Sequence, residues 1–232
     1  MKLTITIDRT AMLLIADTQD GSADRETYNL STDMAVAANL RKALDVCALL
    51  RNPRRYDRVT VVVDTPTILV PTDEFSTGSA ATLYGSTLVQ HQSDEVQTFA
   101  IEALEVVAVF AVSKDLRFVL EENFRYVCFE PRLADTLMAL SHVSYGGFQE
   151  KMFCVFRGSR FDIIAFRKHR LRFCNSFQAE VTEDAVYFIL GVWQQLAMRQ
   201  TDILVISGTP SEPETLKTKL EQFVKNVSFA SI

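Results

Sequence analysis

Two apolar patterns alternate along the chain. In short segments apolar and polar residues alternate or valines cluster, and in longer segments apolar residues return every three or four positions. The first pattern is typical of strands and the second of helices. The beginning of the chain gives the order strand, strand, strand, helix, strand. We expect these strands at 2–8, 11–17, 27–30 and 59–63, and the helix from an N-cap at Ser31 to about Arg51.

The last third of the chain repeats this order. We expect strands at 151–156, 161–166, 171–177 and 202–207, a helix capped by Thr182, and a final helix from a Ser211-x-x-Glu214 capping box to Lys225. Corresponding elements of the two halves begin about 150 residues apart, which is typical of a duplicated unit. The sequence therefore predicts an α/β protein with two βββαβ lobes, in which helices pack on mixed sheets.

An insert is expected in the first lobe at about 66–112. It contains a short apolar run at 68–70 and a weakly patterned helix at 80–92. Two strand-like runs at 96–101 and 105–112 follow, and their spacing predicts a hairpin. The predicted strands and helix of the insert are therefore those of a small subdomain added to the duplicated unit.

The first lobe is expected to resume after the insert. We expect a helix capped by Ser113 and continuing through Phe124, a strand at 126–129, and a helix with Pro131 at its first position that continues through Leu140. The pair Gly146-Gly147 is the expected hinge between the lobes. The predicted domains are then residues 1–147 and 148–232.

Composition and charge narrow the possible partners. The chain has 232 residues, 48% of them hydrophobic, with 24 basic and 29 acidic side chains and a net charge of −5. A negative net charge disfavours general binding to nucleic acid or to anionic membranes. The first residues lack the apolar region of a signal peptide, and the longest apolar stretches are too short or too polar to span a bilayer. We expect a cytoplasmic protein without a membrane segment.

Cysteine and histidine spacing gives no metal motif. The four cysteines lie among apolar neighbours without a C-x-x-C pair, and the three histidines lack a second ligand three or four positions away. These are Cys47, Cys128, Cys154, Cys174, His91, His142 and His169. We expect reduced, buried thiols and no metal site.

One segment departs from the acidic average. Between Glu150 and Arg172, seven basic residues accompany two acidic ones. The candidate basic patch consists of Arg157, Arg160, Arg167, Lys168, Arg170 and Arg172. Charged hairpin turns that remain in solvent explain this pattern, and a docking surface for an acidic partner or RNA is the alternative. The net charge makes nucleic acid the less favoured partner.

Several of these segments resemble a known fold family. The relevant runs are 61–63 leading into 67–71, 106–112 followed by 113–116, and the hairpin at 152–166. In pattern they resemble the actin-like ATPase fold, a duplicated ribonuclease H-like unit. The resemblance covers nearly the whole chain and is strongest to an uncharacterised bacterial family assigned that fold, and more distant to actin-like proteins of pilus assembly and cell division.

The resemblance implies two facing hairpins of the form acid-x-Gly that hold nucleotide phosphates and Mg²⁺. Glycine there lets backbone N–H groups approach the phosphates. The first hairpin reads Asp8-Arg9-Thr10, which keeps the acid but lacks the glycine, and the second reads Phe156-Arg157-Gly158, which keeps the glycine but lacks the acid. The loop on the adenosine side resembles Ser207-Gly208-Thr209, with one glycine where the family usually has two.

Three functions follow from this comparison. The first is a non-catalytic actin-like module for interaction or scaffolding, which binds another protein or itself and uses no cofactor. The second is a residual ATP- and Mg²⁺-binding protein or weak ATPase, whose candidate nucleotide-binding residues are Asp8, Thr10, Asp64, Gly158, Ser159, Gly208 and Thr209. The third is a ribonuclease H-like nuclease in which Asp8, Asp45 and Asp64 hold two metal ions.

Overall fold

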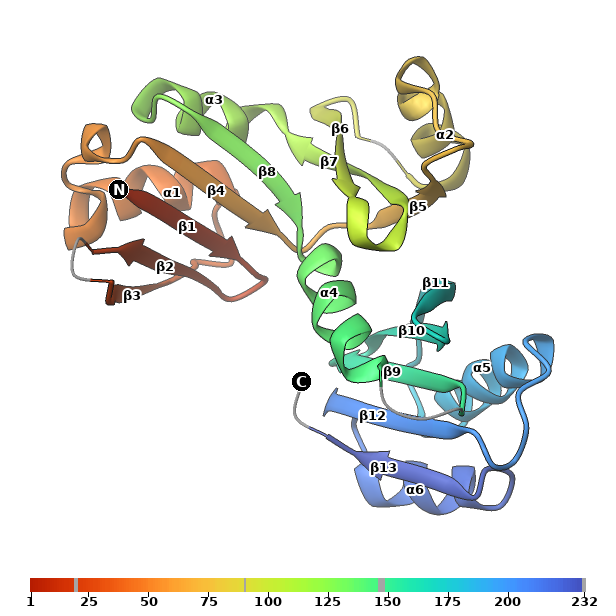
Figure 1. Cartoon of the computed structure of the whole chain (residues 1–232). Helices are drawn as coiled ribbons and strands as arrows, with labels where there is room; N and C mark the ends of the chain where they lie inside the picture. The colour runs from red at the N-terminus through yellow and green to blue at the C-terminus, as the bar shows by residue number, and fades with distance from the viewer. Residues whose placement is uncertain (19–20, 90, 146–148, 231–232) are drawn as a thin grey trace. The chain divides into compact units, whose positions relative to one another are not determined.

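A computed structural model describes residues 1–18, 21–89, 91–145 and 149–230 (Figure 1). The chain forms two compact units, Met1–Ala134 and Asp135–Ile232. The division lies within helix α4 (Arg132–Ser144), whereas the domain boundary predicted from the sequence is at residue 147. The expected hinge at Gly146-Gly147 lies outside the described residues.

Each unit is built on a five-stranded mixed sheet with the same topology. In the first unit the strand order is β3-β2-β1-β4-β8, and in the second it is β11-β10-β9-β12-β13. The first three strands of each unit pair antiparallel, and the fourth and fifth strands join by parallel pairing. This correspondence confirms the predicted duplication and the α/β class.

The strands lie close to their predicted positions, except that the third strand begins four residues before its predicted start at Thr27. The first sheet comprises β1 (Lys2–Ile7), β2 (Ala11–Asp17), β3 (Ala23–Asn29), β4 (Arg58–Val63) and β8 (Val127–Pro131). The second comprises β9 (Lys151–Arg157), β10 (Arg160–Arg167), β11 (Arg170–Gln178), β12 (Ile203–Thr209) and β13 (Asn226–Phe229). Strand β13 was not predicted, because only one of its residues is as much as half-buried and its pairing partner, β12, is more than 15 residues away in sequence.

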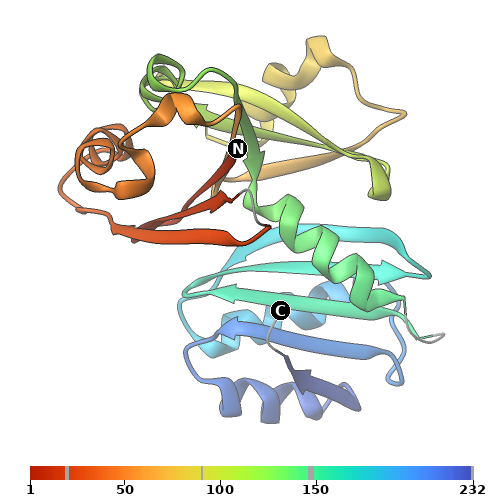
Figure 2. The same ribbon diagram turned by 60° about the vertical axis from the view of Figure 1, so that its left-hand side comes forward.

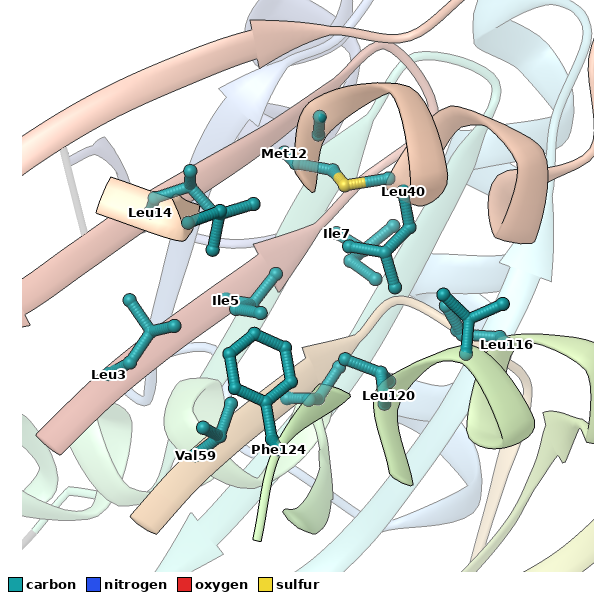
Figure 3. Close-up of a cluster of buried hydrophobic side chains, with 14 of the residues drawn as sticks. Leu3, Ile5, Ile7, Met12, Leu14, Leu40, Val59, Leu116, Leu120 and Phe124 are labelled. Carbon is teal, nitrogen blue, oxygen red and sulfur yellow. The ribbon is translucent and has the colours of Figure 1, made fainter. Parts of the chain in front are cut away.

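The core of the first unit lies between its sheet and two helices, α1 (Val36–Val46) and α3 (Lys114–Asn123) (Figure 3). Alternate residues of β1 point into this core, and Leu40 and Leu120 meet them from the helices. The period of two in β1 and of three to four in the helices places these apolar side chains on one face of each element. The second unit repeats the arrangement with α5 (Thr182–Gln195) and α6 (Pro213–Glu221).

The insert forms a separate three-stranded antiparallel sheet in the order β5-β7-β6. Its elements are β5 (Thr67–Pro71), α2 (Ala80–Thr87), β6 (Asp94–Ile101) and β7 (Val106–Ser113). The β6–β7 hairpin confirms the prediction, and helix α2 ends five residues before its predicted end at residue 92. Residues 106–112 of β7 are all buried, because Tyr84 of α2 packs on one face and the other joins the core of the first unit.

Helix α4 covers the face of the second sheet that α5 and α6 leave open (Figure 2). Two hydrogen bonds from β9 hold it there. Lys151 Nζ donates to the carbonyl oxygen of Val143 at 2.8 Å, and Arg157 Nη2 donates to Thr136 Oγ1 at 3.2 Å. Both faces of the sheet are therefore covered, which explains why six consecutive residues of β10 are buried.

The predicted helix ends were correct only in part. Ser113 caps α3, since its Oγ accepts from the backbone N–H of Leu116 at 3.5 Å. Helix α1 starts at Val36 rather than after Ser31, whose backbone is instead hydrogen-bonded by the side chain of Asn39. Pro131 ends β8, so α4 begins one residue later than predicted.

The two caps predicted in the second unit do not form. Thr182 is the first residue of α5 and donates its hydroxyl to Glu212 Oε2 at 2.8 Å. Helix α6 has Glu212 at its N-cap position without a capping side-chain bond, so the predicted Ser211 and Glu214 box is absent, and the helix ends at Glu221. A contact between distant segments, Thr182 with Glu212, has replaced the local caps. Short 3₁₀ turns complete the described structure at Ala48–Leu50, Pro53–Arg55, Thr77–Ser79 and Glu102–Leu104.

Candidate functional site

The β1–β2 turn is closed by the side chain of Asp8. Its Oδ1 accepts hydrogen bonds from the backbone N–H groups of Thr10 at 2.7 Å and Ala11 at 2.8 Å, and from the Thr10 hydroxyl at 3.1 Å. The backbone N–H of Asp8 also donates to the carbonyl oxygen of Ala11 at 3.0 Å. The carboxylate thus occupies the N–H groups of its own turn, which are the groups that a phosphate cradle would present to a ligand.

Electrostatics favour this closed turn. Partial burial raises the pKa of Asp8, but the hydrogen bonds from Thr10 and Ala11, with the positive charge of Arg132, outweigh it, and the pKa lies below its usual value of 3.8. A carboxylate that accepts backbone N–H bonds is stabilised in its charged form. At neutral pH an incoming phosphate would therefore meet a negative charge at this turn.

The corresponding β9–β10 turn of the second unit carries an aromatic residue in place of the acid. Phe156 is buried, and its ring stacks on that of Phe161 with centroids 4.6 Å apart. Gly158 has φ +68°, and a Cβ added to it would meet no atom within 4 Å. Its glycine is therefore explained by the positive φ of a two-residue hairpin turn, in which glycine is favoured.

The side chain of Arg157 turns away to the α4 face of the sheet. Its Nη1 pairs with Asp162 Oδ2, and its Nη2 reaches Thr136 of α4. The second oxygen of Asp162 accepts from the Ser176 hydroxyl at 2.5 Å. Asp162 is 2% exposed, so this ion pair is buried and links three strands to α4. Arg157 is thus neutralised within the fold.

Gly208, predicted at the adenosine side, has a structural reason to be glycine. It pairs with Phe156 across β12 and β9, and its φ is +82°. A Cβ at this position would lie 1.9 Å from the carbonyl oxygen of Phe156. The neighbouring strand, rather than a ligand, therefore requires the missing side chain. Thr209, the last residue of β12, is exposed.

A small cavity of about 200 Å³ opens between the β9–β10 turn, the start of α5 and the loop between β12 and α6. Its walls are mainly apolar, with a few polar groups at the mouth. The lining residues are Phe156, Gly158, Ser159, Ala179, Glu180, Val181, Thr182, Ala185, Pro210, Ser211 and Leu216. Of the candidate nucleotide-binding residues, the structure brings Gly158 and Ser159 to this cavity.

Sequence reasoning missed most of this cavity, including Glu180, Val181 and Ser211. One signal was available. Segments 178–184 and 209–214, which provide most of the lining, contain five acidic residues and no lysine, arginine or histidine. The sequence alone does not show that these two segments line the same cavity, so the absence of basic residues did not predict a site.

The carboxylates proposed for a nuclease do not form a metal site. Asp64 is half-buried just after β4, and Asp45 is exposed on α1. Within the described residues, no group of three histidine, cysteine, aspartate or glutamate side chains is arranged to hold a metal ion. The predicted set of Asp8, Asp45 and Asp64 is therefore not assembled.

The candidate basic patch is divided between the two ends of β10. Arg157 and Arg160 flank one turn, while Arg167, Lys168 and Arg170 form the other. The eight residues of β10 separate the turns by roughly 20 Å or more. Arg167 and Arg172 both pair with Glu150. These six residues therefore do not form one continuous surface, because successive turns of an antiparallel meander lie at opposite ends of its strands.

The fold identifies a class of protein. A protein from Bacteroides thetaiotaomicron VPI-5482, described as having an actin-like ATPase fold and unknown function, matches with a TM-score of 0.90 and 24% identity, covering 99% of this chain and 90% of that one. The pilus-biogenesis complex PilM–PilN matches with a TM-score of 0.59 and 11% identity, covering 99% and 88%. The chain therefore has the actin-like ATPase fold.

The family is defined more narrowly by sequence. Residues 1–227 match the family described as protein of unknown function DUF3822, and this chain belongs to it. No curated protein matches the sequence. Across the described ranges, none of the helices has both the length and the apolar character needed to cross a bilayer.

Proposed function

We propose that this chain is a non-catalytic actin-like module that acts by binding another protein or a second copy of itself, without ATP or Mg²⁺. The observation that carries the proposal is that the Asp8 carboxylate accepts hydrogen bonds from the backbone N–H groups of Thr10 and Ala11. Those donors are satisfied within the turn. A phosphate could use them only by displacing a charged group that the same bonds stabilise.

The second unit supports the same interpretation. Phe156 stands where the family pattern has an acid, and it is buried against Phe161, so it offers no ligand to a metal ion. Gly208 and Gly158 are explained by strand packing and turn geometry. The cavity beside them, at about 200 Å³, is smaller than the roughly 300–1,000 Å³ usual for cofactor sites.

A solved relative supports a role in protein interaction. The PilM structure is a complex with PilN, so in that protein the fold is part of an assembly for type IV pilus biogenesis. The three-stranded insert at Thr67–Ser113 is an additional surface without a counterpart among the described residues of the second unit.

Thermal unfolding with Mg-ATP tests the proposal. A ligand present at 100 times its Kd stabilises a protein by about 2.7 kcal/mol. In a chain of this size that corresponds to a rise in Tm of roughly 5–10 °C. We expect no rise with Mg-ATP, Mg-ADP or Mg-GTP at millimolar concentration. A saturable rise, or Mg²⁺-dependent release of phosphate that Asp8→Ala abolishes, would contradict the proposal.

Sedimentation velocity distinguishes the two kinds of partner. A concentration-dependent increase in sedimentation coefficient across the micromolar range is expected if the chain binds itself. A single monomer species at every concentration directs the search to a separate protein. Both outcomes agree with a binding module, whereas nucleotide-dependent assembly would favour a residual ATPase.

A further inference from the structure

We propose that the cavity of the second unit is a docking pocket for one lysine or arginine side chain of a basic segment in a separate partner protein. This inference rests on the proposed function, because it names the partner chemistry of a binding module. The argument uses the size of the cavity, its apolar lining and the acids in the segments that line it.

The size of the cavity fits one long side chain. An apolar cavity of about 150 Å³ holds a benzene molecule, and this one measures about 200 Å³. The most buried apolar residues of its lining are Phe156, Ala185 and Leu216, which are 5%, 3% and 1% exposed. An aliphatic chain would bury apolar surface against them, which is the basis of favourable transfer from water.

One acid, Glu180, lines the cavity, and further acids lie in the two segments that provide most of the lining. Segments 178–184 and 209–214 carry Glu180, Glu183, Asp184, Glu212 and Glu214 and no basic residue. Glu183 pairs with Lys219 of α6. Glu180 accepts from the neutral side chain of Gln178, and Glu212 from the hydroxyl of Thr182. Among the described residues, neither Glu180 nor Glu212 forms an ion pair.

An apolar lining with acidic residues beside it selects side chains that are apolar along the stem and positive at the tip. Lysine and arginine have this character, since their methylene groups pack on apolar surface while the charged group stays in water. A purely aliphatic side chain would leave these acids unmatched. Anions are disfavoured, although the start of α5 has a partial positive charge, because Glu183 and Asp184 lie in its first turn.

Titration of ¹⁵N-labelled full-length protein followed by NMR tests this assignment. The probes are Nα-acetyl-lysine methylamide, its norleucine and glutamate counterparts, and inorganic phosphate. We expect the lysine probe to shift the amide signals of Gly158, Ser159 and Val181 in a saturable way, the norleucine probe to bind at least threefold more weakly, and the other two to give no shift. Higher salt should weaken the lysine probe.

Matched variants connect the signal to the pocket. Ser211→Trp places a large ring at the exposed mouth and should abolish the shifts. Glu180→Gln and Glu212→Gln keep the hydrogen-bonding shape and should each weaken the lysine probe about two- to fivefold, as expected for loss of one partly screened charge. Glu122→Gln, an exposed acid on α3 of the first unit, is the control and should have no effect.

Several results would overturn the pocket. Equal binding of norleucine and lysine would leave the acids without a role, and shifts with phosphate alone would make it an anion site. A dimer that Ser211→Trp dissociates would show that the occupant is a second copy. If the lysine probe does not bind, the result of the Mg-ATP experiment is unaffected. A rise in Tm with Mg-ATP would contradict the proposed function without changing the result of the lysine titration.

Discussion

Gly208 on β12 lies directly against the carbonyl oxygen of Phe156 on β9, so close that a Cβ would come within 1.9 Å of that oxygen. The contact joins the two positions at which the phosphate and adenosine loops of this fold would be expected. Backbone from one strand fills the space that a side chain on the other would need. The absence of a side chain at Gly208 therefore follows from strand packing.

Replacement of Gly208 by alanine should destabilise the chain strongly. The added methyl group meets backbone that cannot move without disturbing the β9–β12 pairing, and φ of +82° is itself strained for alanine. We expect a loss of about 2–4 kcal/mol in the free energy of unfolding. Urea titration followed by the fluorescence of Trp193, which is buried in the second core, measures it.

Two other glycines serve as controls for this substitution. Gly158→Ala, with positive φ and open space around it, should lose about 1 kcal/mol. Gly191→Ala, on the exposed side of α5, should gain about 0.5–1 kcal/mol because alanine favours a helix. A Gly208→Ala variant no less stable than Gly158→Ala would show that β9 and β12 separate easily.

The buried pair of Arg157 and Asp162 should be sensitive to loss of one partner. Asp162→Ala leaves the Arg157 guanidinium partly buried without its carboxylate, and we expect a loss of about 3–5 kcal/mol. The double variant Arg157→Met with Asp162→Leu should recover much of that loss, because an apolar pair avoids an unpaired charge. Urea titration measures the free energy of unfolding of the single and double variants. Equal values for the two variants would contradict this account.

The Asp8 turn should make stability depend on acid. The pKa of Asp8 is lowered by folding, so its ionised form stabilises the native state above the ordinary value of 3.8, and that contribution is lost as pH falls through the lower, folded value. Asp8→Ala should be less stable than the parent by about 1 kcal/mol at pH 7.

The test is to compare the two proteins from pH 7 down to about pH 2.5. Their difference in free energy of unfolding should stay constant to about pH 4 and then shrink as the Asp8 carboxylate protonates. Asp8→Asn, which keeps an acceptor for the N–H groups of Thr10 and Ala11, should lie between them at neutral pH. A difference that grows in acid would mean that the folded carboxyl prefers its protonated form.

Two serines that look alike in the sequence should behave differently. Ser113 accepts from the N–H of Leu116 at the start of α3, so Ser113→Ala should cost about 0.5–1 kcal/mol. Ser211 precedes α6 without capping it, because Glu212 occupies the N-cap position, and Ser211→Ala should be neutral within about 0.5 kcal/mol. Thermal unfolding of both variants measures the contrast, and equal losses would restore the capping box predicted at Ser211.

Local pattern was sufficient for most elements of the fold. The alternation in β1 and β2, the valine run of β4 and the helical spacing of α3 and α5 depend on neighbours within a few residues, and each was predicted close to its place. The duplicated topology followed from the repeated order. The Asp8 turn also lies within four residues, although its closure of the N–H groups became clear only from the hydrogen bonds.

Contacts between distant residues decided the rest. Thr182 bonds to Glu212 across thirty positions, Arg157 reaches Thr136 on α4, and β13 is a strand because β12 lies beside it. A local sequence pattern does not predict such partners. A polar group can bond to any donor or acceptor that folding brings within about 3 Å, however distant it is in the sequence. The sequence thus determined which faces are apolar and in what order the elements occur. Only the tertiary structure decided which turns are closed, why Gly208 has no side chain, and which acidic residues lie beside an apolar cavity.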